Sequence, residues 1–223
     1  MSDDSFIREV DEELRQDQFK SLWNRFGNII IAVAVLIVVA TGSYRFWENY
    51  TSKQAAASGD AFLSAIDLAA QGKQDDAIAK FDELAKSGHG QYPALARLRV
   101  AGEKIARGDA AGAIADFDAL AGDGAIPEPL RSVASLRAGM AAVDTETYEQ
   151  VKARLESLAA AGGHYRHLAR EALGLSALRN GADQEALVWF QSIVDDAGSA
   201  GNVRTRATIM LDLLAGRGVK SAG

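Results

Sequence analysis

The sequence contains no cysteine and only three prolines among its 223 residues. Without cysteine the chain can form no disulfide, has no thiolate nucleophile and offers no cysteine ligand to a metal. Few prolines and abundant alanine favour helix along the whole chain. No stretch of alternating β-branched residues indicates a strand. We therefore expect an all-α protein, and the lack of cysteine is compatible with an oxidising periplasm.

Motifs of common catalytic sites are missing as well. The sequence has no Gly-x-Ser-x-Gly, no phosphate-binding loop and no His-Glu-x-x-His. His164 and His167 lie three residues apart but lack the further ligands of a metal site, so we expect a surface or capping role for them. A net charge of −6 argues against nucleic-acid binding. We expect no enzyme activity, no cofactor and no metal.

One long hydrophobic run is present. From Phe26 to Tyr44, nineteen consecutive residues carry no charge, and about 20 apolar residues span a bilayer as a helix. A cleaved signal peptide has a shorter apolar core followed by small residues, whereas the flank here is Tyr44-Arg45-Phe46-Trp47. Aromatic residues at both ends suit the two membrane interfaces. We predict a transmembrane helix over 26–47 that contacts the lipid bilayer.

The basic residues that flank this run predict its orientation. Four precede it, Arg8, Arg15, Lys20 and Arg25, and two follow it, Arg45 and Lys53. Because cytoplasmic flanks carry the excess of Lys and Arg, the N-terminus is expected in the cytoplasm. The remainder then lies across the membrane, which in a bacterial inner membrane is the periplasm.

The soluble part repeats itself. Glycine, alanine and an aromatic residue recur at the same spacing in Gly72–Leu84, Gly108–Leu120 and Gly181–Ile193, with a degenerate copy at 148–158. Phe81, Phe117, Leu155 and Phe190 are separated by 36, 38 and 35 residues. A period near 35 is typical of a solenoid of helical hairpins.

The chemistry of each repeat explains its pattern. The glycines can end a helix because they adopt positive φ at little cost. Four and seven residues after each alanine come the aromatic and aliphatic side chains, on one face of the second helix. First helices are expected at about 59–71, 92–107, 129–142, 165–179 and 203–215.

This pattern resembles the tetratricopeptide repeat, in which glycine precedes the second helix and alanine, an aromatic and an aliphatic residue follow. The first helices match through Leu98 and Ala101 only. We expect a TPR-like α-solenoid of about four helical hairpins. The predicted division is a cytoplasmic acidic tail over 1–25, the membrane helix over 26–47, a stalk or helix continuation over 48–58, the TPR-like domain over 59–215 and a flexible tail over 216–223.

The whole arrangement resembles the YfgM-type family of bacterial inner-membrane proteins. The resemblance rests on the acidic tail, the single anchor, the aromatic exit Tyr44–Trp47, and Tyr92–Leu98 followed by the Gly108 hairpin. It implies an ancillary subunit of the SecYEG translocon that associates with periplasmic chaperones. A TPR adaptor for another cell-envelope assembly has the same sequence features, and an envelope enzyme with an unrecognised site is a third reading.

Bases on the first helices are the candidate protein-binding residues. TPR-like solenoids expose a concave face lined mostly by the first helices. The bases expected on this face are Arg97, Lys104, Arg131, Arg137, Arg166 and Arg170. Such a stripe suits acidic or C-terminal carboxylate segments of a partner. The alternative is an ordinary solvated face, because long cationic side chains often cover apolar surface.

The predicted topology is tested by a reporter fused after Gly223. We expect activity only from a reporter that works in the periplasm, and a mature N-terminus at or near Met1. Recovery of a soluble species that starts beyond residue 45 would contradict the uncleaved anchor.

Overall fold

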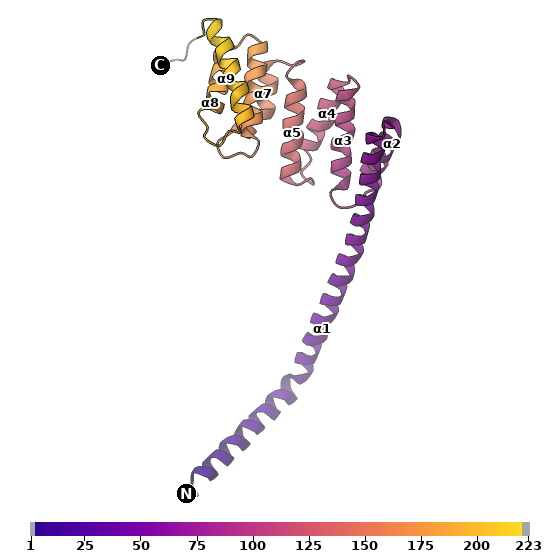
Figure 1. Cartoon of the computed structure of the whole chain (residues 1–223). Helices are drawn as coiled ribbons and strands as arrows, with labels where there is room; N and C mark the ends of the chain where they lie inside the picture. The colour runs from indigo at the N-terminus through magenta and orange to yellow at the C-terminus, as the bar shows by residue number, and fades with distance from the viewer. Residues whose placement is uncertain (1–2, 220–223) are drawn as a thin grey trace. The chain divides into compact units, whose positions relative to one another are not determined.

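The computed structural model describes residues 3–219 and, for 3–25 and Ile30, the backbone alone (Figure 1). Every regular element in these residues is an α-helix, which confirms the expected class. The chain divides into two compact units, Met1–Lys53 and Gln54–Gly223. Residues 48–58 are helical, whereas 1–2 and 220–223 of the two predicted tails lie outside the described residues.

The first unit consists of most of helix α1, Asp3–Ala70, which continues into the second unit. From Phe26 onward α1 is long and apolar enough to cross a membrane, by its length and composition. Its large apolar side chains, such as Leu36 and Val38, are exposed. The hydroxyl of Thr41 donates to the carbonyl oxygen of Ile37 at 2.7 Å, so this polar group is satisfied within the helix.

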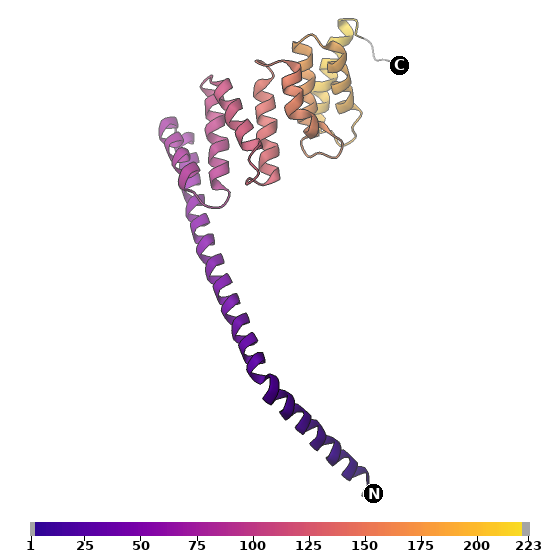
Figure 2. The ribbon, with the colours of Figure 1, turned by 180° about the vertical axis from the view of Figure 1, so that it is seen from behind.

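The second unit is a stack of helical hairpins (Figures 1 and 2). After the C-terminal part of α1 come α2 (Gln74–Ser87), α3 (Tyr92–Ala106), α4 (Ala110–Ala121), α5 (Glu128–Ala142), α6 (Tyr148–Ala159), α7 (Arg166–Arg179), α8 (Asp183–Val194) and α9 (Gly201–Gly216). The first helices of the hairpins are α1, α3, α5, α7 and α9, and the second helices are α2, α4, α6 and α8. Consecutive helices from α2 to α9 pack together, and neighbouring first helices from α3 to α9 also touch.

Glycine ends three of the first helices, as the repeat pattern predicts. Gly72, Gly108 and Gly181 have φ angles of 78°, 84° and 76°, values that side chains with a Cβ rarely adopt. The degenerate repeat uses a different connection. Thr147 and Gln150 form a capping box at the start of α6. Their side chains accept hydrogen bonds from backbone N–H groups that have no partner within the helix.

The predicted core positions of the second helices are buried. Phe81, Phe117, Leu155 and Phe190 are each at most 1% exposed. The buried hydrophobic residues form three clusters along the second unit, and the largest cluster extends from α4 to α9. A hairpin therefore buries its apolar face only by stacking on its neighbours.

Two glycines of the first helices lie directly against large side chains of second helices. A Cβ on Gly139 would lie 2.4 Å from Leu155, and one on Gly174 would lie 2.7 Å from Cζ of Phe190. Ala101 occupies the same position in α3 and packs in one cluster with Phe117. The sequence did not single out these glycines, because glycine inside a helix usually only weakens it.

Substituting a helical glycine should have opposite effects at two sites. Gly174→Ala should lower the free energy of unfolding by about 1 kcal/mol or more, because its Cβ overlaps the fully buried ring of Phe190. Gly102→Ala should be neutral or raise it by up to about 1 kcal/mol, since its Cβ meets nothing closer than 3.6 Å and alanine favours helix. Thermal unfolding of the full-length protein in a non-ionic detergent measures both. Equal melting temperatures for the two variants would contradict the packing described.

Candidate functional site

The first helices have two different sides. Each of α3, α5 and α7 contacts the second helix before it and the second helix after it, and each also lies beside the next first helix. We call the side that faces the second helices the inner side, and the opposite side the open side. The six predicted binding residues fall on both.

Arg97 and Lys104 lie on the inner side of α3. They line a cleft of about 500 Å³ whose walls include side chains of α2 and α4. Nη1 of Arg97 is 3.4 Å from Oδ2 of Asp123, and Nζ of Lys104 is 2.6 Å from Oδ2 of Asp116. Two further acids, Asp82 and Glu103, line the same cleft, so it offers no excess positive charge to a ligand.

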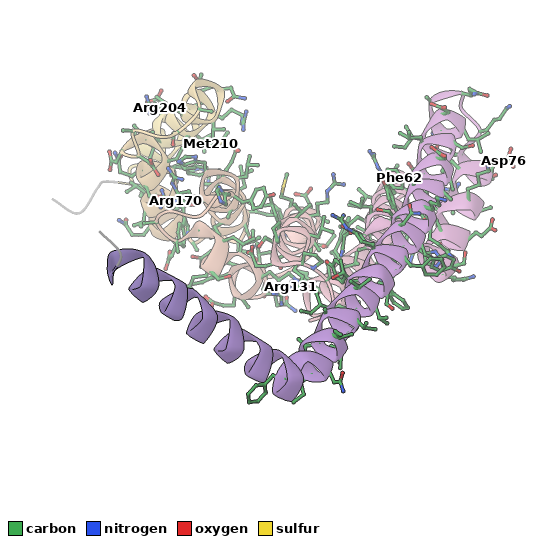
Figure 3. The ribbon with its side chains drawn as sticks, turned by 90° about the horizontal axis from the view of Figure 1, so that it is seen from below. Phe62, Asp76, Arg131, Arg170, Arg204 and Met210 are labelled. Carbon is green, nitrogen blue, oxygen red and sulfur yellow. The ribbon has the colours of Figure 1, made fainter. Side chains whose placement is uncertain are left out.

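Arg166 and Arg170 on α7 both bind the carboxylate of Asp196. Nε of Arg166 and Nη1 of Arg170 lie 2.6 and 3.2 Å from Oδ2 of Asp196. Arg170 also donates to the carbonyl oxygens of Ala159 and Ser192, at the ends of α6 and α8. Arg204 of α9, which Figure 3 labels together with Arg170, donates to the carbonyl oxygen of Asp196 itself at 3.0 Å. These arginines join three hairpins around one loop.

The charges around Asp196 shift its ionisation. Hydrogen bonds from Arg166 and from the backbone N–H of Gly198, together with the close approach of His167, hold the pKa of Asp196 well below its usual range. His167 Nε2 lies 2.9 Å from Oδ2 of Asp196, and its side chain is only 14% exposed. His167 is therefore part of this internal cluster and not a surface residue. No group of three or more potential metal ligands occurs among the residues that the structure describes.

The same ion pair occurs in two repeats. Arg97–Asp123 and Arg170–Asp196 have the same spacing along the chain, and both acids accept the backbone N–H two residues later. An ion pair that recurs at equivalent positions of two repeats is typical of a contact that stabilises the repeat fold. The bases that form it are already engaged within the chain.

Arg131, labelled in Figure 3, and Arg137 lie on α5 and form no ion pair among the side chains that the structure describes. Nε of Arg131 is buried and has no hydrogen-bond partner among them. Arg137 is exposed on the open side, where its Nη1 lies over Gly102 of α3. The structure thus brings the six bases into no single stripe, and four of them bind carboxylates of the chain. Protein binding through this set stays a prediction.

A second hollow lies on the open side, over α5, α7 and α9. It has a volume of about 400 Å³, and we call it the open-side groove. Its apolar lining consists of Met140, Val143, Leu168, Ala172 and Leu175. Met140 is 51% and Leu168 38% exposed. Exposed apolar side chains gathered in a hollow are typical of a protein-binding surface.

The charged rim of this groove is partly neutralised. Glu171 of α7 binds Arg206 of α9, with Nη2 of Arg206 at 2.7 Å from Oε2 of Glu171. Asp144 at the end of α5 is exposed and has no ion pair in the described part of the chain. Sequence reasoning missed the groove. A signal for it exists in the sequence. Met140 follows Gly139 and Leu175 follows Gly174, and because these glycines face second helices, the next residue points toward the open side.

The Asp196 cluster should make stability depend on pH. Because the pKa of Asp196 is lower in the folded than in the unfolded state, its contribution is present above its unfolded pKa of about 4 and is lost as the pH falls below it. Asp196→Asn should melt below the wild type at pH 7, and the difference should shrink toward pH 3. Thermal unfolding of the full-length protein at both pH values measures it.

Asp212→Asn is the matched control, because Asp212 is an exposed acid of α9 without an ion pair among the described residues. It should melt like the wild type at both pH values. A constant difference between Asp196→Asn and wild type from pH 7 to pH 3 would contradict the role given to this carboxylate.

Comparison with known proteins agrees with this architecture. The family model of the tetratricopeptide repeat-like domain matches residues 20–215. No curated protein and no solved structure gives a match. Repeat domains of this kind are protein-interaction scaffolds. The matched region covers the greater part of the chain, its helical hairpins and both hollows, and the chain therefore belongs to the tetratricopeptide repeat-like domain family.

Proposed function

We propose that this protein is a membrane-anchored scaffold that binds other proteins through the open side of its hairpins. The observation that carries the proposal is the open-side groove, where Met140 and Leu168 expose apolar surface within a hollow between first helices. Burial of such side chains by a partner is favourable by about 25 cal/mol per Å². The inner-side cleft is a weaker candidate, because carboxylates of the chain already occupy its bases.

Anchoring follows from the apolar stretch of α1. Its length and composition suit a membrane span, and the excess of bases before it favours a cytoplasmic N-terminus. The hairpins then lie on the far side of a bacterial inner membrane, in the periplasm. A scaffold held there meets proteins that act at or emerge from that membrane.

The partners we propose are the SecYEG translocon and the periplasmic chaperones that receive exported chains. Support comes from the resemblance to the YfgM-type family in the acidic tail, the single anchor, the aromatic exit Tyr44–Trp47 and the first repeat. In this role the protein holds a chaperone near the translocon exit and catalyses no reaction. An adaptor for another envelope assembly differs only in the identity of the partner.

Site-specific photo-crosslinking in intact membranes tests the proposal. A photoreactive amino acid replaces Met140 in the groove or, as a control, Val188, which is similarly exposed but lies on the second helix α8. We expect the probe at Met140 to capture translocon subunits or periplasmic chaperones, identified by mass spectrometry, several-fold more than the probe at Val188.

Two outcomes contradict parts of the proposal. Capture by the Met140 probe of proteins from another envelope assembly alone would exclude the translocon role and favour the adaptor. Equal or greater capture at Val188 would exclude the open side as the binding surface.

A further inference from the structure

Two arginines of the open side lack partners. Arg99 on α3 and Arg137 on α5 are exposed and form no hydrogen bond or ion pair among the described residues. Other arginines of the hairpins, such as Arg107, Arg154 and Arg206, bind carboxylates of the chain. A guanidinium carries five donors in a planar fork that fits a carboxylate. Arg131 of α5 is also unpaired but is half-buried, so Arg99 and Arg137 are distinguished by being both unpaired and exposed.

The positions of Arg99 and Arg137 in their helices are equivalent. Arg99 precedes Ala101 by two residues, and Arg137 precedes Gly139 by two. Ala101 and Gly139 are the small residues that face second helices, so both arginines point to the same side of the stack. Nη1 of Arg137 lies over Gly102, one helical turn from Arg99 on α3. The missing side chain of Gly102 leaves room beside the two cations.

Apolar surface continues from this basic site. Met140 lies three residues after Arg137 and is therefore its neighbour on the same face of α5. Beyond Met140 the open-side groove follows onto α7 with Leu168 and Leu175. The open side thus presents two unpaired cations on α3 and α5 and, next to them, an apolar hollow over α5 to α9.

The remaining charges of the groove give it a direction. Glu171 is neutralised by Arg206, whereas Asp144 at the groove edge has no ion pair in the described part of the chain and would repel a carboxylate there. A ligand with acids at one end and apolar side chains at the other would therefore bind in one orientation. Its carboxylates would lie at the arginines, because like charges disfavour the reverse arrangement.

We propose, on the basis of the proposed function, that the open side binds a protein segment in which acidic residues are followed directly by apolar ones. Its carboxylates bind Arg99 and Arg137, and its apolar side chains enter the groove at Met140, Leu168 and Leu175. A basic or purely polar segment is excluded from this surface by the unpaired arginines and the apolar lining.

The test uses the full-length protein in a non-ionic detergent and a displayed library of random twelve-residue peptides. We expect the selected peptides to be enriched in Asp or Glu next to Leu, Met or Phe. Fluorescence anisotropy of a selected peptide should show at least about tenfold weaker binding to the double variant Arg99→Gln/Arg137→Gln, because hydrogen bonds to charged groups are lost. Binding to the wild type should weaken as salt is raised.

The matched controls change the same charge or the same type of side chain elsewhere. Lys86→Gln/Arg107→Gln removes two exposed cations of α2 and the α3 C-terminus, and should change the affinity less than twofold. Met140→Ser should weaken binding, and Val188→Ser on α8 should not, although both side chains are more than half exposed.

Three results would each overturn the proposal. They are failure to select any peptide, selection of peptides without the acidic and apolar composition, and unchanged binding of the selected peptide to Arg99→Gln/Arg137→Gln. Its failure differs from that of the proposed function. The probe at Met140 can also be tested in the variant Arg99→Gln/Arg137→Gln. If it captures the same partner proteins in equal amount there, the proposed scaffold function is retained and only the proposed class of ligand is wrong.

Discussion

The second unit depends on contacts between a large side chain of each second helix and a small residue of the first helix. The ring of Phe190 lies where Gly174 has no side chain, and Leu155 lies in the same way against Gly139. Such contacts bury the large side chain completely and bring the two helices close together. One hairpin buries only part of its apolar surface in this way, so the next hairpin must cover the rest. The inner sides of the first helices are consequently largely covered by second helices, whereas their open sides carry exposed side chains such as Met140.

Polar contacts fix how one repeat sits on the next. Arg107 binds Asp75, Arg154 binds Asp118 and Arg206 binds Glu171, and each pair lies about one repeat apart along the chain. Arg206 lies on the first helix α9, whereas Arg154 lies on the second helix α6 and Arg107 directly follows α3. Exposed pairs add little stability individually, but their recurrence holds each hairpin in one register. Arg99 and Arg137 belong to none of these pairs, and they are the arginines that we propose for contact with a partner.

Much of the fold was predictable from the sequence, and less of the site. The spacing of Phe81, Phe117 and Phe190 gave the period and the buried face, because a repeated core position leaves a direct pattern. The turn glycines were predicted because positive φ strongly selects glycine. The ion pairs of Arg97 with Asp123 and of Arg170 with Asp196 were not predicted, since each acid lies 26 residues further along the chain, in a loop. Gly139 and Gly174 were overlooked for a similar reason, because a close contact depends on the opposite helix.

The local nature of these contacts also matters while the chain is being made. From α2 to α9, helices contact only their neighbours along the chain or the next first helix. Each hairpin can therefore bury its second helix as soon as the following first helix has been synthesised, without waiting for the C-terminus. Folding can proceed in the order of translation, with little apolar surface exposed at any moment. The hairpins can in this way be largely folded by the time the last repeat has been synthesised.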